Sequence, residues 1–206
     1  MRTALVLASL LISQVAFAGE SVRTVTNFTT IKAKGAFNMV VEVGKNPSVV
    51  VKGSNQFADR ISTEVVGDEL RIMNKDHKNN TVNSDDQVII TVPALNRIKV
   101  EGVGATTVSN LNNKEFEIEY EGVGKLVASG KSTNLRLSAK GVGMVDAKQL
   151  VAEQVSATLD GVGSVDVHAK NQLSASVHGI GSLTYYGKPK TVSKTADGIG
   201  SIRAGD

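Results

Sequence analysis

The sequence predicts an all-β protein: a parallel β-solenoid of about six coils, capped at one end by an N-terminal β-sheet layer. Three observations predict this fold class. A Gly-Val-Gly or Gly-Ile-Gly unit recurs through the second half of the chain, apolar and polar residues alternate around each unit, and short alternating segments precede the first unit. Aromatic residues make up only 4% of the chain, while Val, Thr, Ser and Gly are common, which favours strands and turns over helices.

The glycine units recur at a nearly constant interval. Their first glycines are spaced by 20, 19, 20, 18 and 19 residues, so each repeat has the size of one structural unit that stacks on the next. We interpret the glycines as corners where the chain bends, because glycine accepts backbone angles that other residues avoid. The corner residues are Gly102, Gly104, Gly122, Gly124, Gly141, Gly143, Gly161, Gly163, Gly179, Gly181, Gly198 and Gly200.

The residue between the two glycines is expected to fill the core. In the fourth repeat the apolar positions are Ala157, Leu159, Val162, Val165 and Val167. Their two-residue steps indicate strands, and we interpret the three-residue steps on either side of Val162 as bends. On this interpretation Val162→Asp would unfold the coil locally, because an unpaired buried charge costs on the order of several kcal/mol.

Residues 22–96 lack the repeat and form the predicted N-terminal layer, while residues 97–206 form the solenoid, within one continuous domain over 22–206. Gly67-Asp68 is expected to be the two-residue loop of a hairpin. The strands expected in the layer are Phe28–Lys34, Phe37–Val43, Val49–Lys52, Ile61–Val66, Leu70–Met73 and Val88–Val92.

Residues 1–18 predict a cleavable signal peptide. Arg2 precedes the apolar run from Ala4 to Ile12, and Ala16-Phe17-Ala18 matches the small-x-small pattern of a cleavage site. We therefore expect an exported protein that is periplasmic, at the cell surface or secreted. No later segment reaches the roughly 20 apolar residues that a membrane span needs.

Composition excludes several classes of function. The chain has no cysteine, which rules out disulfides, thiol chemistry and thiolate metal sites. Its net charge is +3 with both signs interspersed, so no basic footprint for nucleic acid is present. We expect no cofactor and no metal site; the one polar loop with a histidine, around His77 with Asp76, Asp85 and Asp86, would at most collect a weakly held cation.

Several short motifs occur in a specific order along the chain. They are Phe28-Thr-Thr-Ile31, Val92-Pro-Ala-Leu95, the segment from Ile98 to Gly104, the recurring Gly-x-Gly-Ser, Tyr186-Gly-Lys-Pro189 and the segment from Gly198 to Ile202. With these motifs the chain resembles the auto-transporter adhesin, head GIN domain family over roughly residues 25–204. The resemblance implies an N-terminal β-layer that continues into a right-handed parallel β-helix, in proteins of the bacterial envelope or secreted from it. It supplies no catalytic residues.

Residues at one register of stacked repeats form a column, and two columns carry polar side chains. Immediately before the glycine units stand Glu101, Glu121, Lys140, Asp160, His178 and Asp197. This column is either a stripe that binds a cation or a glycan, or a solvated row in which opposite charges relieve one another.

The second polar column follows the glycine units and is the candidate binding patch. It consists of Asp146, Lys148, Asp166, His168 and Tyr186, and Thr184 and Arg203 continue it. The two carboxylates on neighbouring coils resemble the pair of a retaining glycosidase. That reaction also needs a cleft and an aromatic sugar platform, and the chain has no Trp and three Tyr.

These features favour a non-catalytic, adhesin-like binding module of the cell envelope or the secreted fraction, with no catalytic residues. Its expected partner is a glycan, a cell-wall polymer or a protein. Two alternatives stay open: a carbohydrate-active enzyme on a β-helix scaffold, which rests on fold analogy, and a purely structural envelope protein that oligomerises.

Overall fold

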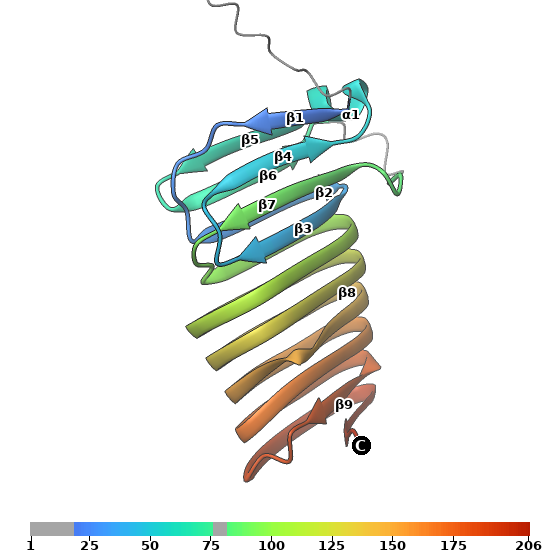
Figure 1. Ribbon diagram of the computed structural model, residues 1–206. Helices are drawn as coiled ribbons and strands as arrows, with labels where there is room; N and C mark the ends of the chain where they lie inside the picture. Colours follow the sequence, from blue (N-terminus) through green and yellow to red (C-terminus); the bar gives the residue numbers. More distant parts are fainter. Residues whose placement is uncertain (1–18, 76–81) are drawn as a thin grey trace, which may run out of the picture.

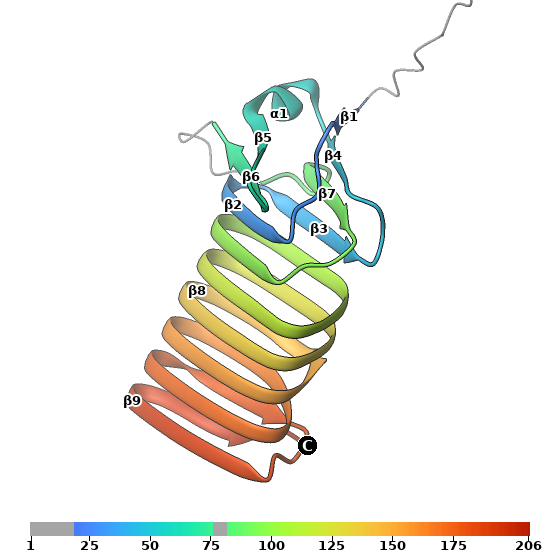
Figure 2. The same cartoon turned by 90° about the vertical axis from the view of Figure 1, so that its left-hand side faces the viewer.

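The computed structural model describes residues 19–75 and 82–206, and these residues form one mixed β-sheet. The sheet has nine strands in the order β1-β4-β7-β3-β8-β2-β6-β5, with β9 paired to β8. It winds into a nearly closed, barrel-like shape (Figures 1 and 2). The elements are β1 (Glu20–Arg23), β2 (Thr30–Ala36), β3 (Asn38–Val43), β4 (Ser48–Lys52), α1 (Asn55–Arg60), β5 (Ile61–Val66), β6 (Glu69–Asn74), β7 (Gln87–Val92), β8 (Arg97–Tyr186) and β9 (Thr191–Ala204).

Strand β8 contains five of the six glycine repeats in 90 uninterrupted residues. It winds around the molecule, so that each repeat lies beside the next one along the chain (Figure 2). A Cβ atom added to Gly122 would meet the backbone of Gly102, and one added to Gly141 would meet Gly122. Strand β9 continues the winding in parallel, with each residue paired to the residue 19 positions earlier, as in Gly179 with Gly198.

The predicted right-handed parallel β-helix of about six coils, capped by an N-terminal β-sheet layer, is wrong. Strands β2 and β3 pair in parallel with the first turn of β8, with Thr30 beside Arg97 and Met39 beside Thr106. Strands β1, β4 and β5 then add antiparallel pairs to the same sheet. The N-terminal segment and the repeats therefore form one mixed, barrel-like sheet, because backbone hydrogen bonds cross the boundary that the sequence pattern indicated.

The prediction that the residue between the glycines fills the core is also wrong. Side-chain direction alternates without a break through the fourth repeat: Leu159 and Val165 are buried, whereas Val162 is 46% exposed. Gly161 and Gly163 thus occupy inward positions, where a Cβ on Gly163 would meet the carbonyl oxygen of Gly143. The glycines continue the strand through a tight bend and are not corners between separate strands.

The strands expected before the repeats agree with β2 to β7 to within one or two residues at each end. The predicted hairpin loop is confirmed, because β5 and β6 pair antiparallel across Gly67 and Asp68 and Gly67 has a φ of +65°. Helix α1 was not expected; the Ser54 hydroxyl caps it by accepting a hydrogen bond from the Phe57 N–H at 3.1 Å. The signal peptide expected over residues 1–18 lies outside the described residues.

The two ends of the barrel differ. At the N-terminal end, α1 and the antiparallel strands lie over the wound sheet (Figure 1), and Phe57 of α1 is buried. At the C-terminal end, β9 pairs with β8 along one side and most of its residues are exposed. Lys194 takes the register of the buried residue Ala175 and places its ammonium 4.5 Å from the ring centroid of Tyr185. An inward charge on an edge strand is a common protection against edge-to-edge pairing.

Candidate functional site

The structure brings the five patch residues to one face of the winding strand, on three successive turns. The Lys148 ammonium lies 4.0 Å from the ring centroid of Tyr186, within cation–π range. Between their turns lies His168, whose ring contacts Gly187; a Cβ on that glycine would come within 2.6 Å of the His168 Cδ2 atom. The absence of a side chain at Gly187 therefore leaves space for the imidazole.

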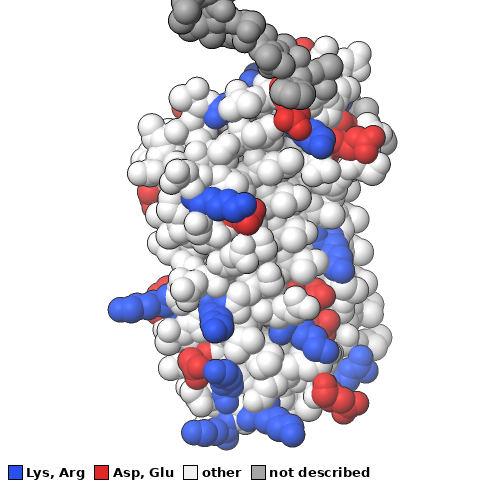
Figure 3. Space-filling model, in the orientation of Figure 1, with Lys and Arg blue, Asp and Glu red and all other residues white. Residues whose placement is uncertain are grey.

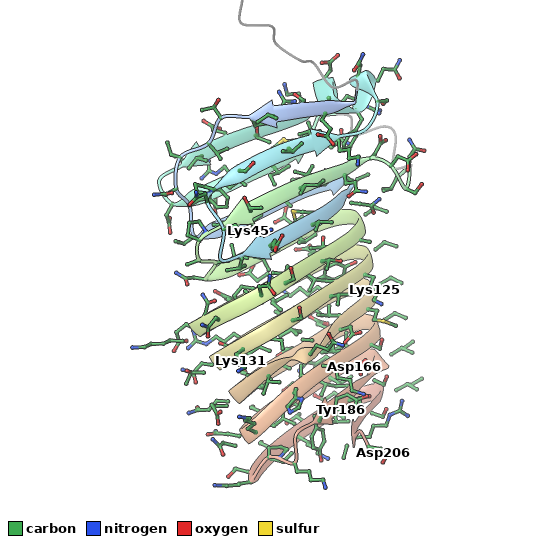
Figure 4. The ribbon with its side chains drawn as sticks, in the orientation of Figure 1. Lys45, Lys125, Lys131, Asp166, Tyr186 and Asp206 are labelled. Atoms are coloured by element: carbon green, nitrogen blue, oxygen red, sulfur yellow. The ribbon has the colours of Figure 1, made fainter. Side chains whose placement is uncertain are left out.

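Asp146 and Asp166 lie on neighbouring turns of this face, and both are half-buried. The Oδ1 atom of Asp146 accepts a hydrogen bond from the Lys148 backbone N–H at 3.2 Å. Figure 4 shows Asp166 and Tyr186 on the same side of the lower half of the barrel. Of the two residues expected to continue the column, Thr184 is 8% exposed and Arg203 on β9 is exposed.

The patch is an open surface with mixed charge. In Figure 3, Lys, Arg, Asp and Glu side chains are interspersed with uncharged surface over the lower part of the molecule. A hollow of about 950 Å³, lined by Lys52, Ser54 and Asp86 among others, lies at the N-terminal end, away from Asp146 and Asp166. Asp146 and Asp166 do not line this hollow, whereas glycosidases work in a water-excluding cleft.

Other candidate groups have structural roles or fall outside the patch. Asp86 is buried and accepts hydrogen bonds from the Asn83 amide at 2.9 Å and the Ser54 N–H at 3.4 Å, so it anchors the loop before β7. Burial raises the pKa of Tyr120, which lies inside the barrel and is unavailable as a sugar platform. Asp76 and His77 lie outside the described residues. Over residues 19–75 and 82–206, no three His, Asp or Glu side chains gather as a metal site.

The column before the glycine units is exposed along most of its length, and its two ends are paired within the chain. Glu101 lies 2.8 Å from the Lys99 ammonium, and the hydrogen bond and charge of Lys99 lower the pKa of Glu101. At the other end, His178 Nδ1 lies 3.2 Å from Asp197 Oδ2. Between these ends, Glu121, Lys140 and Asp160 are exposed.

Sequence reasoning missed the most continuous exposed feature, a line of apolar side chains that we call the ridge. The side chains between the paired glycines project outward on successive turns, with 51% exposure at Val123, 52% at Val142 and 55% at Ile180. Counting the alternation through the glycines would have indicated this direction. The ridge consists of Val103, Val123, Val142, Val162, Ile180 and Ile199.

Comparison with known proteins identifies the family. The family model described as "Putative auto-transporter adhesin, head GIN domain" matches residues 27–189. The chain belongs to this family. No curated protein matches it.

Solved crystal structures of other proteins share the architecture. A crystal structure described as a putative adhesin from Bacteroides fragilis is 27% identical, with a TM-score of 0.70 over 90% of this chain and 95% of that one. A second, from Parabacteroides merdae, is 16% identical with a TM-score of 0.53 over 91% and 95%, and supports the fold alone. In the described part of this head GIN protein, no helix is long and apolar enough to cross a membrane.

Proposed function

We propose that this head GIN protein is an exported, non-catalytic binding module whose partner contacts the patch of Asp146, Lys148, Asp166, His168 and Tyr186. The observation that carries the proposal is the Lys148 ammonium held over the Tyr186 ring at 4.0 Å. This contact limits the freedom of both side chains before a partner arrives. A surface that is ordered in advance loses less entropy on binding.

The chemistry of the patch suits a polyhydroxylated polymer such as a glycan or a cell-wall polymer. Carboxylates accept hydrogen bonds from hydroxyl groups, an imidazole can donate and accept them, and an ammonium donates them. Neighbouring turns repeat these groups at about 4.8 Å, which presents a regular row to a repetitive ligand. A protein partner is the alternative that the test below separates.

Export and absence of catalysis complete the proposal. The signal-peptide pattern of residues 1–18 and the adhesin description of the family both support a protein of the envelope or the medium. Catalysis by Asp146 and Asp166 is disfavoured because the carboxylates lie on an open face.

Binding of the labelled mature chain to a glycan array and to isolated cell walls tests the proposal. We expect saturable binding that Lys148→Ala and Asp166→Asn weaken at least about tenfold, since the first removes an ammonium that contacts the polymer and the second removes the negative charge of a carboxylate that accepts its hydroxyl groups. The control is Lys131→Ala, which lies at the opposite edge of the barrel (Figure 4) and should bind normally. Binding that survives both patch substitutions, or binding to protein alone, would contradict a glycan-binding patch. Release of sugar that stops in Asp166→Asn would instead establish an enzyme.

A further inference from the structure

We infer that the ridge is a self-association surface on which a second copy of the chain packs in the reversed direction. The ridge runs along the winding strand from Val103 to Ile199, a length of about 24 Å for five steps of about 4.8 Å. A contiguous exposed apolar row of this kind marks an interaction surface more often than isolated apolar residues do. The patch proposed above lies four to six residues after the ridge on each turn, outside the three columns that form the contact described below.

The charged residues beside the ridge are complementary to those of a second, reversed copy of the chain. The column two residues before the ridge reads, from the N-terminal to the C-terminal end, Glu101, Glu121, Lys140, Asp160, His178 and Asp197. In a two-fold symmetric pair with reversed ridges, this column faces its own reversed copy. Lys140 then faces Asp160 of the second copy, and the symmetry makes this contact twice.

The remaining positions are compatible with the reversed, fully overlapping arrangement. Glu121 faces His178 of the second copy, again twice. Glu101 faces Asp197 at the two ends, where each carboxylate already has a partner within its own chain, Lys99 for Glu101 and His178 for Asp197. Like charges therefore meet only at the two ends of the column, where Glu101 and Asp197 each contact another side chain of their own chain.

The column two residues after the ridge adds no repulsion. It reads Ala105, Lys125, Met144, Ser164, Ser182 and Ser201, and reversal places Lys125 opposite Ser182 and Met144 opposite Ser164. Met144 is 40% exposed and widens the apolar strip at the centre of the contact.

Other arrangements offer fewer favourable contacts between charges. In a two-fold symmetric pair with both ridges in the same direction, the column before each ridge faces the column after the other ridge. Glu121 then faces Lys125 of the second copy, but Lys140 faces Met144 and Asp160 faces Ser164. Shifting the reversed ridges by one turn toward either end centres the contact on Lys140 or on Asp160, so that the same charge meets itself. Because like charges in direct opposition weaken association, the reversed and fully overlapping register is the one that the sequence of charges favours.

The strip is narrow, three side chains wide on a bend, so it buries less than the roughly 800 Å² per partner of a standard stable interface. The expected dimer is therefore weak and reversible. If the proposed function is correct, such a dimer carries two binding patches and gains avidity on a repetitive polymer; the dimer itself does not depend on that function.

Sedimentation velocity of the mature chain, from about 1 µM to about 1 mM, tests the inference without any ligand. We expect a concentration-dependent dimer. The double variant Val142→Asp/Val162→Asp should raise its dissociation constant at least about tenfold, because it places charges at the apolar centre of the contact. The matched control is Val66→Asp, a 41% exposed valine on β5 away from the ridge, which should dimerise normally. Melting curves verify that each variant is folded.

Charge reversal tests the register. Lys140→Asp and Asp160→Lys should each weaken the dimer at least about tenfold, because each creates two like-charge contacts, and the double variant should return to within about threefold of the wild type. A chain that is monomeric throughout, a dimer indifferent to the ridge variants, or a double variant as weak as the single variants would overturn the inference. Ridge-dependent binding of monomers to phosphatidylglycerol vesicles would overturn it in favour of a lipid surface.

Discussion

At the residue scale, the paired glycines stand where the inner side of a bend has no space for a side chain. A Cβ on Gly163 would meet the carbonyl oxygen of Gly143 one turn earlier, and the φ of Gly163 is +154°. Both the contact and the backbone angle disfavour any other residue at this position. The adjacent Val162 projects away from the core, so substitutions at this position disturb the fold less.

Gly163→Ala should therefore destabilise the protein by about 2 kcal/mol or more, through steric overlap and backbone strain. Val162→Asp is the matched control one residue away, and as an exposed substitution it should change the free energy of unfolding by about 0.5 kcal/mol or less. Urea denaturation of both variants measures the two values. A larger loss of stability in Val162→Asp than in Gly163→Ala would show that the Val162 side chain points into the core.

The same residues explain where sequence reasoning failed. Glycine carries no side chain whose polarity could mark it as inward or outward, so the interval from Leu159 to Val165 was interpreted as two bends around an inward valine. A first turn was also missed, because Gly35-Ala36-Phe37 lacks the second glycine although Gly35 pairs with Gly102 and Ala36 with Val103. The short helix α1 has one polar cap and six residues, too little for a helical period to emerge.

At the element scale, strands bounded by turn residues could be predicted well. β5 and β6 alternate strictly and are joined by Gly67-Asp68, so their positions followed from the sequence. Their place in the sheet did not follow, because which strands pair depends on long-range contacts that alternation does not encode. Alternation also predicts that the patch residues share a face. It does not predict the cation–π contact between Lys148 and Tyr186, which depends on how the turns lie beside one another.

The pairing of Lys99 with Glu101 on the first turn of β8 predicts a pH dependence. The hydrogen bond and charge of Lys99 lower the pKa of Glu101 from its ordinary value of 4.5. A carboxyl with a lowered pKa in the folded state adds stability above its unfolded pKa, and this contribution is lost as the pH falls through the folded pKa. Below pH 4.5 the free energy of unfolding should thus fall more steeply in the wild type than in Glu101→Gln.

Denaturation of both proteins between pH 3 and pH 6 measures this difference. The partner Lys99 does not interfere, since the same pairing raises its pKa from 10.5 and its contribution changes only in alkali. Parallel curves for the wild type and Glu101→Gln would show that the pair is not formed in solution.

The position of β9 at the end of the winding predicts a gradient of backbone protection. β9 pairs with β8 along one side, whereas the middle turns of β8, such as the buried segment around Leu126 and Ala128, have a neighbouring turn on either side. Amides of β9 should exchange with solvent at least about tenfold faster than those of the middle turns, because local opening of an edge strand breaks fewer contacts. Hydrogen-exchange mass spectrometry measures both, and equal protection would imply that the C-terminal end is covered in solution.

At the scale of the whole molecule, the protein is one continuous barrel-like sheet with two separate outward features. The patch follows the ridge by four to six residues on each turn, and we expect that one can engage a polymer while the other engages a second copy. The N-terminal end is covered by α1 and antiparallel strands (Figure 1), and the inward Lys194 protects the other end.

Cysteine labelling measures the outward direction of the ridge directly. The chain contains no cysteine, so each of the variants Val162→Cys and Val165→Cys has a single thiol. The two positions are three residues apart, and Val165 is the buried control. Under native conditions and at a concentration where the chain is monomeric, Val162→Cys should react with a maleimide or a disulfide reagent at nearly the rate of the unfolded protein. Val165→Cys should be protected by roughly a thousandfold, because its thiol reacts only when the sheet opens. Protection at position 162 equal to that at position 165 would contradict the account.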